Sequence, residues 1–196
     1  MRRALLLFPC MVWLHATPAA ADTIDFEGLS DLEAVTTQFP GLVFSNALAL
    51  TSGLLGGTLN EIENPPYSGV TVITDDGGPM SITFLAPVLE FSGFLTYNTT
   101  LTITAFDAAD SVLGSLSSLF NNNQYLSGVP GSSPNELLAL SFAQGISRIV
   151  IGGSSSGDSF TLDDVTTSPV PEPGVLTLFL ISAALLVGVR RRLAKT

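Results

Sequence analysis

Short runs of alternating apolar and polar residues repeat through the middle of the chain, from about residue 22 to residue 168. A period of two is the pattern of a strand with one buried and one exposed face. In the run TIDFE, Ile24 and Phe26 fall on one face, and Asp25 and Glu27 fall on the other. The runs are rich in Val, Ile, Thr and Phe, and Gly, Pro, Asn and Asp separate them. This composition favours strands joined by turns.

The pattern predicts about nine strands and no helix longer than a turn or two. The expected strands lie at 23–27, 41–46, 69–75, 81–97, 100–107, 111–116, 136–142, 147–153 and 159–165. Residues 81–97 read as two strands that meet near Pro87, and 100–107 forms a hairpin with 111–116. A short helical turn with Ser30 as its N-cap is expected within 29–39. Closely spaced strands of this kind predict an all-β fold, an antiparallel, jelly-roll-like β-sandwich that forms one domain from 22 to 168.

The first 21 residues have the three parts of a secretory signal peptide. Arg2 and Arg3 are basic, the segment 4–14 is apolar, and small residues follow as far as Ala21. We expect signal peptidase to cleave after Ala21 and the general secretion machinery to export the domain. A retained N-terminal anchor is the alternative, but this apolar segment is too short to span a bilayer.

The composition of the expected domain excludes several classes of function. It contains 16 acidic residues and a single basic residue, Arg148, so its formal net charge is −15. Nucleic acid is a poor partner for such a field. The segment 22–168 contains no Cys, His, Lys or Trp. Nucleophilic sites that need a histidine base, zinc sites of His or Cys, and lysine chemistry are therefore excluded from it.

The first and last strands carry the acidic residues that suggest a metal site. Terminal strands of sandwiches commonly pair, and this would bring Glu27 close to Asp163 or Asp164. Clustered carboxylates must be solvated, protonated or bound to a cation. Oxygen ligands suit Ca²⁺, so these three residues are a candidate structural calcium site. Solvated charges at the strand ends are the alternative interpretation.

Two further features bear on a ligand. The longest connection, 120–136, is rich in Gly, Pro, Ser and Asn, and long loops often carry function. Tyr67, Tyr97 and Tyr125 are available to stack on a sugar. Paired carboxylates also permit a glycosidase, but the pairs fall in turns and at strand ends. Polysaccharide binding is therefore favoured over polysaccharide cleavage.

The C-terminal segment 169–196 has the pattern of a membrane-inserted tail. Residues 174–189 are apolar or small, and Arg190, Arg191 and Arg192 follow them. A helix of this length reaches about 24 Å, against about 30 Å of hydrocarbon, and flanking arginines extend it. We expect a transmembrane helix with its basic end in the cytoplasm and the domain on the periplasmic side.

The sequence Val170-Pro171-Glu172-Pro173, followed by this apolar segment and the arginine cluster, resembles the PEP-CTERM sorting signal of Gram-negative bacteria. The same type of tail is also labelled an ice-binding protein C-terminal domain. The resemblance covers about 27 residues. It implies an exosortase, a membrane protease that cuts near the Pro-Glu-Pro motif and releases the protein. It also implies a role in exopolysaccharide or biofilm material. The body resembles the jelly-roll-like domains of such proteins more loosely.

These features together predict a non-enzymatic protein of the cell surface or extracellular matrix. It would be anchored in the inner membrane first and then released by the exosortase. Two alternatives remain open at this stage. One is a permanently membrane-anchored carbohydrate-binding protein, and the other is a carboxylate-based glycosidase.

Overall fold

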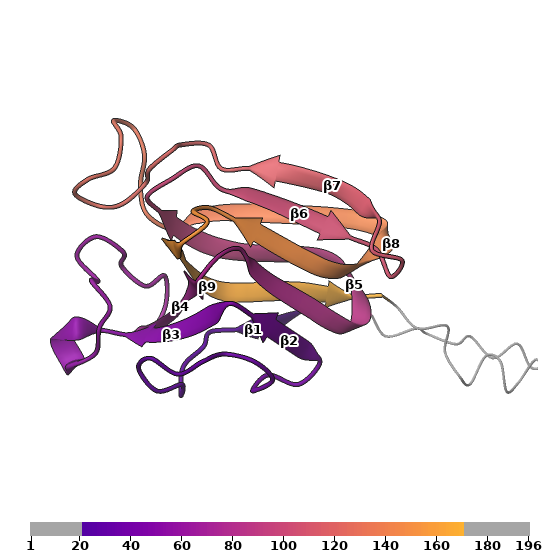
Figure 1. Cartoon of the computed structure of the whole chain (residues 1–196), viewed down its shortest axis with the longest axis horizontal. Coiled ribbons are helices and arrows are strands. Elements are labelled where there is room, and N and C mark those ends of the chain that lie inside the picture. Colours follow the sequence, from indigo (N-terminus) through magenta and orange to yellow (C-terminus); the bar gives the residue numbers. More distant parts are fainter. Residues whose placement is uncertain (1–20, 171–196) are drawn as a thin grey trace, which may run out of the picture. The chain divides into compact units, whose positions relative to one another are not determined.

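A computed structural model describes residues 21–170, which form nine strands and one short 3₁₀ turn (Figure 1). The elements are β1 (Asp22–Ile24), β2 (Leu42–Ser45), β3 (Ala47–Thr51), η1 (Gly53–Leu55), β4 (Thr71–Asp76), β5 (Met80–Tyr97), β6 (Thr102–Phe106), β7 (Val112–Ser117), β8 (Glu136–Gly152) and β9 (Gly157–Pro169). Every strand pair is antiparallel. The expectation of an all-β antiparallel domain of about nine strands is confirmed.

The predicted signal peptide, Pro-Glu-Pro motif, transmembrane helix and arginine cluster lie outside the described residues, apart from Ala21 and Val170. Between residues 21 and 170, no helix has the length and apolar character needed to cross a membrane.

All nine strands belong to one hydrogen-bonded sheet. The sheet has two halves, and the long strands β5 and β8 run through both of them. In β5, residues 80–84 pair with β2 and with the second half of β8, whereas residues 90–97 pair with β9 and with the first half of β8. The register between β5 and β8 shifts between Thr83 and Val88, around Pro87. The halves therefore have the orders β7-β6-β8-β5-β2 and β3-β4-β9-β5-β8, and β1 pairs with the end of β9.

One hydrophobic core joins the inner faces of the two halves. Met80, Ile103 and Ile149 come from the first half, and Phe91 and Leu162 come from the second. All five side chains are fully buried and belong to the same cluster. Two sheet halves that bury their apolar faces in one cluster must face each other, so the sheet is folded into a sandwich.

The main differences from the expected strands concern length. The strands expected at 136–142 and 147–153 are one strand, β8, and the two expected within 81–97 are one strand, β5. The strand β3 was not expected, because its sequence ALALT lacks aromatic and β-branched residues before Thr51. The segment 29–39 contains turns and one bridge to β3, so the expected helical turn is absent there.

Strand β4 is buried on both faces, although alternation predicted one exposed face. Ile73 faces the main core, whereas Val72 is buried outside it. The connection 52–70 crosses this region, and Leu59 within it is also buried outside the main core. This connection therefore covers part of the outer surface of the second half of the sheet, and it positions the site described next.

Candidate functional site

The first and last strands pair as expected, with Ile24 opposite Val165. Glu27 follows β1, and Asp163 and Asp164 lie in β9. All three carboxylates contact the same short segment, residues 67–71, which leads into β4. The prediction that the terminal strands pair is confirmed, and these three carboxylates contact one segment. A direct approach of Glu27 to Asp163 or Asp164 stays a prediction.

Glu27 holds the end of this segment. Its Oε1 accepts the backbone N–H groups of Val70 and Thr71, each at 2.8 Å. Gly69 lies against the Glu27 carboxylate with a φ of 53°, so a larger residue there would meet both strain and the carboxylate. This close approach explains why a glycine precedes β4.

Asp163 holds the start of the segment. Its Oδ2 accepts the N–H groups of Tyr67 at 2.8 Å and Ser68 at 2.9 Å, and its Oδ1 accepts the N–H of Asp164. The Ser68 hydroxyl donates to Asp164 Oδ1 at 2.8 Å. Burial raises the pKa of Asp163, whereas the hydrogen bonds that it accepts from the N–H groups of Ser68 and Asp164 lower it. Burial has the larger effect, and the pKa is about 6.

The carboxylate oxygens described here thus accept hydrogen bonds from the protein itself. No group of three acidic, histidine or cysteine side chains suited to a metal ion occurs between residues 21 and 170. A calcium ion held by Glu27, Asp163 and Asp164 stays a prediction, and these contacts give it no support.

Another acidic residue, Glu63, joins the two long connections of the domain by hydrogen bonds. Residues 52–70 and 118–135 lie at the same end of the sandwich (Figure 1). Glu63 Oε2 accepts the N–H groups of Leu126 at 3.0 Å and Ser127 at 3.2 Å. The Glu63 carbonyl accepts the N–H of Tyr125. The hydrogen bonds to its carboxylate, above all the one from Leu126, lower the pKa of Glu63, so this carboxylate is charged at neutral pH. We call these contacts between Glu63 and residues 125–127 the Glu63 clamp.

Replacing Glu63 with glutamine is expected to loosen this clamp without unfolding the domain. Hydrogen exchange at the amides of Leu126 and Ser127 should become several-fold faster, because a charge-assisted acceptor is lost. Glu61→Gln is the matched control, since Glu61 accepts the N–H groups of Gly53 and Leu54 in the η1 turn. Unchanged exchange at 126 and 127 in Glu63→Gln would contradict the clamp.

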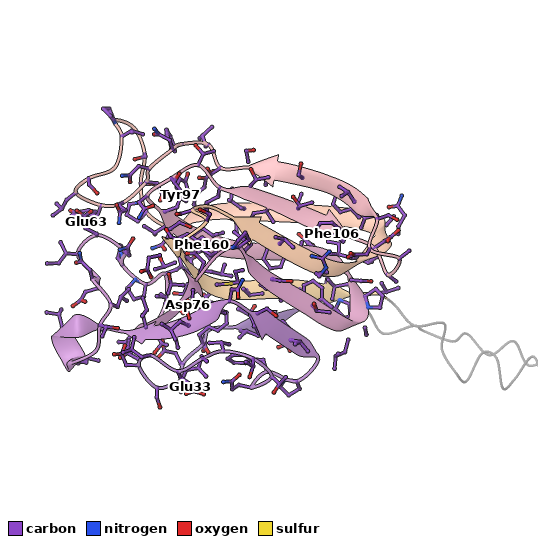
Figure 2. All side chains as sticks on the ribbon, viewed as in Figure 1. Glu33, Glu63, Asp76, Tyr97, Phe106 and Phe160 are labelled. Atoms are coloured by element: carbon purple, nitrogen blue, oxygen red, sulfur yellow. The ribbon has the colours of Figure 1, made fainter. Side chains whose placement is uncertain are left out.

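Between the two connections lies a pocket of about 190 Å³. Asn64 and Gln124 come one from each connection, and their side-chain amides meet at 3.1 Å. Asn98 also lines the pocket, and its Nδ2 donates to the Asp158 carbonyl at 3.1 Å. The remaining lining residues come from β3, β4, β9 and the first connection: Leu50, Thr58, Leu59, Asn60, Thr74, Ser159, Phe160 and Thr161. Figure 2 shows Glu63 and Phe160 toward this end of the domain and Phe106 toward the other.

The polar groups of the pocket are mainly amides and hydroxyls, and Leu50, Leu59 and Phe160 add apolar lining. Amides both donate and accept, as do hydroxyls, whereas the lining includes no basic group and only one carboxylate, Asp158. Such a site cannot neutralise an anion. Glycoside hydrolysis uses two carboxyl groups across the bond, and the pocket presents one. The volume is below the usual range for drug-sized ligands, so a small polar group fits it.

An exposed aromatic residue, Tyr67, lies beside the pocket on the same face of the sheet. Tyr67 stacks on Phe94, with ring centroids 3.4 Å apart and an angle of 7° between the ring planes. The Tyr67 side chain is 51% exposed. Phe94 is opposite Asp163 in the β5–β9 register, and Thr161 of the pocket lies two residues before Asp163. Phe94 therefore fixes the orientation of an exposed ring close to the pocket.

Of the three tyrosines expected to be available for stacking, Tyr97 is not. It is 0% exposed, and its hydroxyl donates to the Glu136 carboxylate. Burial and this partner raise its pKa to about 12. Tyr125 is exposed, as expected. The Asp75–Asp76 pair ends β4, and Asp75 is buried.

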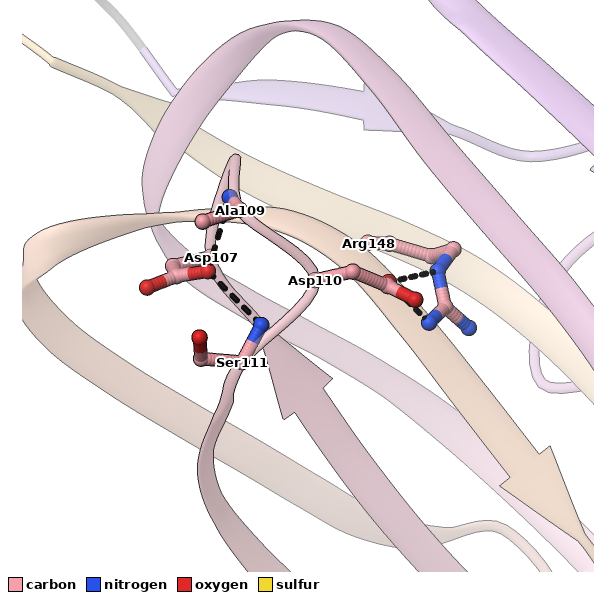
Figure 3. Close-up of polar contacts among 5 residues, drawn as sticks. All are labelled: Asp107, Ala109, Asp110, Ser111 and Arg148. Atoms are coloured by element: carbon pink, nitrogen blue, oxygen red, sulfur yellow. Dashed lines mark hydrogen bonds and ion pairs between the residues drawn. The ribbon is translucent and has the colours of Figure 1, made fainter.

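Arg148, the single basic residue of segment 22–168, interacts with residues outside this pocket. Arg148 lies over the ring of Phe106 at 3.9 Å from its centroid and pairs with Asp110, with an Nε–Oδ1 distance of 3.1 Å (Figure 3). Asp107 accepts the N–H groups of Ala109 and Ser111 and so shapes the turn that presents Asp110. Arg148 is therefore not part of the pocket.

Sequence reasoning missed most of the pocket. It singled out the loop that contains Gln124, but it did not connect Asn60, Asn64 or Asn98 with that loop. The concentration of Asn and Gln in 120–124 was the available signal. The partner residues are distant in sequence, so only the folded chain identifies them.

Comparison with known proteins supports the fold alone. No protein-family model and no curated protein matches the chain. A DUF4465 family protein from Bacteroides caccae has a similar structure, with a TM-score of 0.50 and 12% identity over 77% of this chain and 100% of that one. Two other structures have lower TM-scores. They are the K2 cleaved adhesin domain of Lys-gingipain (TM-score 0.49, 14% identity, 76% of this chain and 99% of that one covered) and the family 29 carbohydrate-binding module CBM29_1 from Piromyces equi (TM-score 0.41, 9% identity, 82% and 98% covered).

Proposed function

We propose that this is an exported, non-enzymatic protein of the cell surface or extracellular matrix, whose domain binds a neutral polysaccharide. The observation that carries the proposal is the pocket, which presents amides from both connections, hydroxyls mainly from β4 and β9, and no basic group. Sugar hydroxyls act as donor and acceptor at once, and amide side chains match both roles. The small volume suits one sugar unit or a chain end.

The position of Tyr67 supports the same proposal. An exposed ring held by stacking on Phe94 offers the apolar face on which a sugar ring packs. The ring and the pocket lie on one sheet face, so a chain of several units can contact both.

We further propose that an exosortase sorts the protein through its PEP-CTERM tail. The order of parts in the sequence supports this: Val170-Pro171-Glu172-Pro173, the apolar segment and Arg190–Arg192. The last strand ends at Pro169, and Val170 at the start of the motif is exposed. Cleavage at the motif would therefore leave every described strand of the domain intact.

Binding of neutral polysaccharides to residues 22–170 tests the first proposal. In a glycan array followed by calorimetry, Asn64→Ala combined with Gln124→Ala is expected to weaken binding about tenfold or more, because two hydrogen-bonding amides leave the pocket. Ser132→Ala is the control: its hydroxyl donates to the Val129 carbonyl in the same connection, and neither residue lines the pocket. Absence of binding to every neutral polysaccharide would refute the proposal.

Replacing Pro171, Glu172 and Pro173 with alanine tests the sorting proposal in a native host. The variant is expected to stay uncleaved in the membrane fraction, whereas the wild-type protein should lose Arg190–Thr196 and leave it. Mass spectrometry of both fractions measures this. A wild-type protein that keeps its C-terminus would instead indicate a permanent anchor.

A further inference from the structure

One side of the sandwich has two strands with an unpaired edge. Strand β7 pairs with β6 alone, and residues 136–141 of β8 pair with β5 alone. Among residues 21–170, no other backbone hydrogen bond involves either stretch. The ring of Phe142 in β8 lies against Gly114 in β7, so the two stretches are on the same side. We call them the open edge.

The opposite side of the sandwich is closed. The N–H of Phe44 in β2 donates to the Thr36 carbonyl at 2.7 Å. In β3, the N–H of Ala49 donates to the Glu33 carbonyl at 2.8 Å, and the Ala47 carbonyl accepts the N–H of Val35. The segment 33–36 therefore covers the outer edges of β2 and β3. The short strand β1 begins with the charged Asp22, which also discourages pairing.

The open edge also lacks charge. The segment 111–147 contains both of its stretches and a single ionisable charge, Glu136. That carboxylate is partly buried, and it accepts the Tyr97 hydroxyl and the N–H of Leu119. All the other acidic residues of the domain lie outside this segment. Two copies of a domain with a net charge of −15 would repel each other least at this edge.

Apart from Glu136, the side chains of the open edge are apolar or hydroxylic. Val112 is 63% exposed and Leu137 is 55% exposed. Leu113 and Leu116 of β7 and Leu140 of β8 pack against the core but are only partly buried. Natural edge strands are usually protected by charges, prolines or covering segments, and β7 has none of these.

We propose that the open edge binds a second copy of this chain. Strand β7 of one copy lies antiparallel to β7 of the other, and the stretches 136–141 flank this contact. The pairing satisfies the free N–H and C=O groups of β7 and extends the first half of the sheet across both copies. It also covers the partly buried leucines. The interface contains no salt bridge, so salt strengthens the dimer by screening the remaining repulsion.

Cysteine crosslinking tests the contact directly, because residues 22–170 contain no cysteine. This segment is suitable for the test, since its core residues, from Phe26 to Val165, all lie within it. Ser115→Cys in β7 is expected to give a covalent dimer with a short bis-maleimide, and Ser45→Cys in β2 is expected to give none. Equal crosslinking at both positions, or none at Ser115→Cys, would overturn the proposal.

Sedimentation equilibrium supplies a second, independent measurement. The wild-type domain is expected to dimerise as concentration and salt increase, and Ser115→Glu combined with Ser117→Glu should weaken the dimer at least tenfold. Ser45→Glu carries the same type of substitution on the closed side and should have no effect. A domain that stays monomeric at millimolar concentration in high salt refutes the proposal. None of these outcomes depends on polysaccharide binding.

Discussion

Replacing Asp75 with alanine is expected to lower the free energy of unfolding by about 3 kcal/mol. Asp75 is 0% exposed, and its Oδ1 accepts the N–H groups of Ser159 at 2.7 Å and Phe160 at 3.2 Å. Alanine leaves both buried N–H groups without an acceptor, and each costs about 1–3 kcal/mol. The melting temperature of the domain should fall by about 10 °C.

Asp75→Asn is the matched variant for this prediction. Its side-chain oxygen can still accept both N–H groups, and its amide can donate to the Ser159 hydroxyl, which now donates to Asp75 Oδ2 at 2.6 Å. We expect it to lose less than about 1 kcal/mol. Ser159 and Phe160 line the pocket, so the alanine variant should also bind ligand more weakly. Equal unfolding midpoints in urea for the alanine and asparagine variants would contradict this account.

The second large effect concerns pH. The folded-state pKa of Asp163 is about 6, above the ordinary value of 3.8, because burial disfavours its charged form. Below pH 6 the folded state therefore binds this proton more strongly than the unfolded state does. From pH 7 to pH 5, this group should increase the stability of the domain by about 1 kcal/mol. Asp164 and Glu27, which contact the same segment, are the acidic neighbours.

Other acidic groups determine the pH below which the stability no longer increases. Hydrogen bonds lower the pKa values of Asp31, Glu33, Glu61 and Glu63 below their ordinary 3.8 or 4.5. Their contributions are present at neutral pH and are lost as the pH falls from the ordinary values through the lowered ones. Stability should therefore be highest near pH 5. Urea unfolding from pH 7 to pH 3 measures this, and Asp163→Asn should abolish the increase between pH 7 and pH 5. An unchanged increase in that variant would show that Asp163 is not its source.

The existence and type of most elements could be predicted from local pattern. The alternation in 100–107 and 111–116 predicted the hairpin of β6 and β7, and Ile103 is buried as that pattern requires. The pairing of the terminal strands was also predicted, and it places Glu27 and Asp163 around one segment. Each of these results depends on burial of one face of a strand, which the local pattern records.

The site could be predicted only in outline. The sequence pointed to the loop with Gln124, but the partner of that residue, Asn64, is 60 positions away. Tyr67 and Tyr97 look alike in sequence, yet one is stacked at the surface and the other is buried against Glu136. Their difference follows from the strands that surround them and not from their own neighbours in the chain.

The sequence by itself determined the β class of this protein, its charge and the chemistry it lacks, because composition and alternation act locally. The tertiary structure alone decided that β5 and β8 continue through both halves of the sheet, since partners on both sides hold them past Pro87. It also decided that Asp163 accepts backbone hydrogens and that β7 keeps a free edge. These outcomes depend on which distant segments pair, and the pairing minimises unsatisfied polar groups and exposed apolar area over the whole chain.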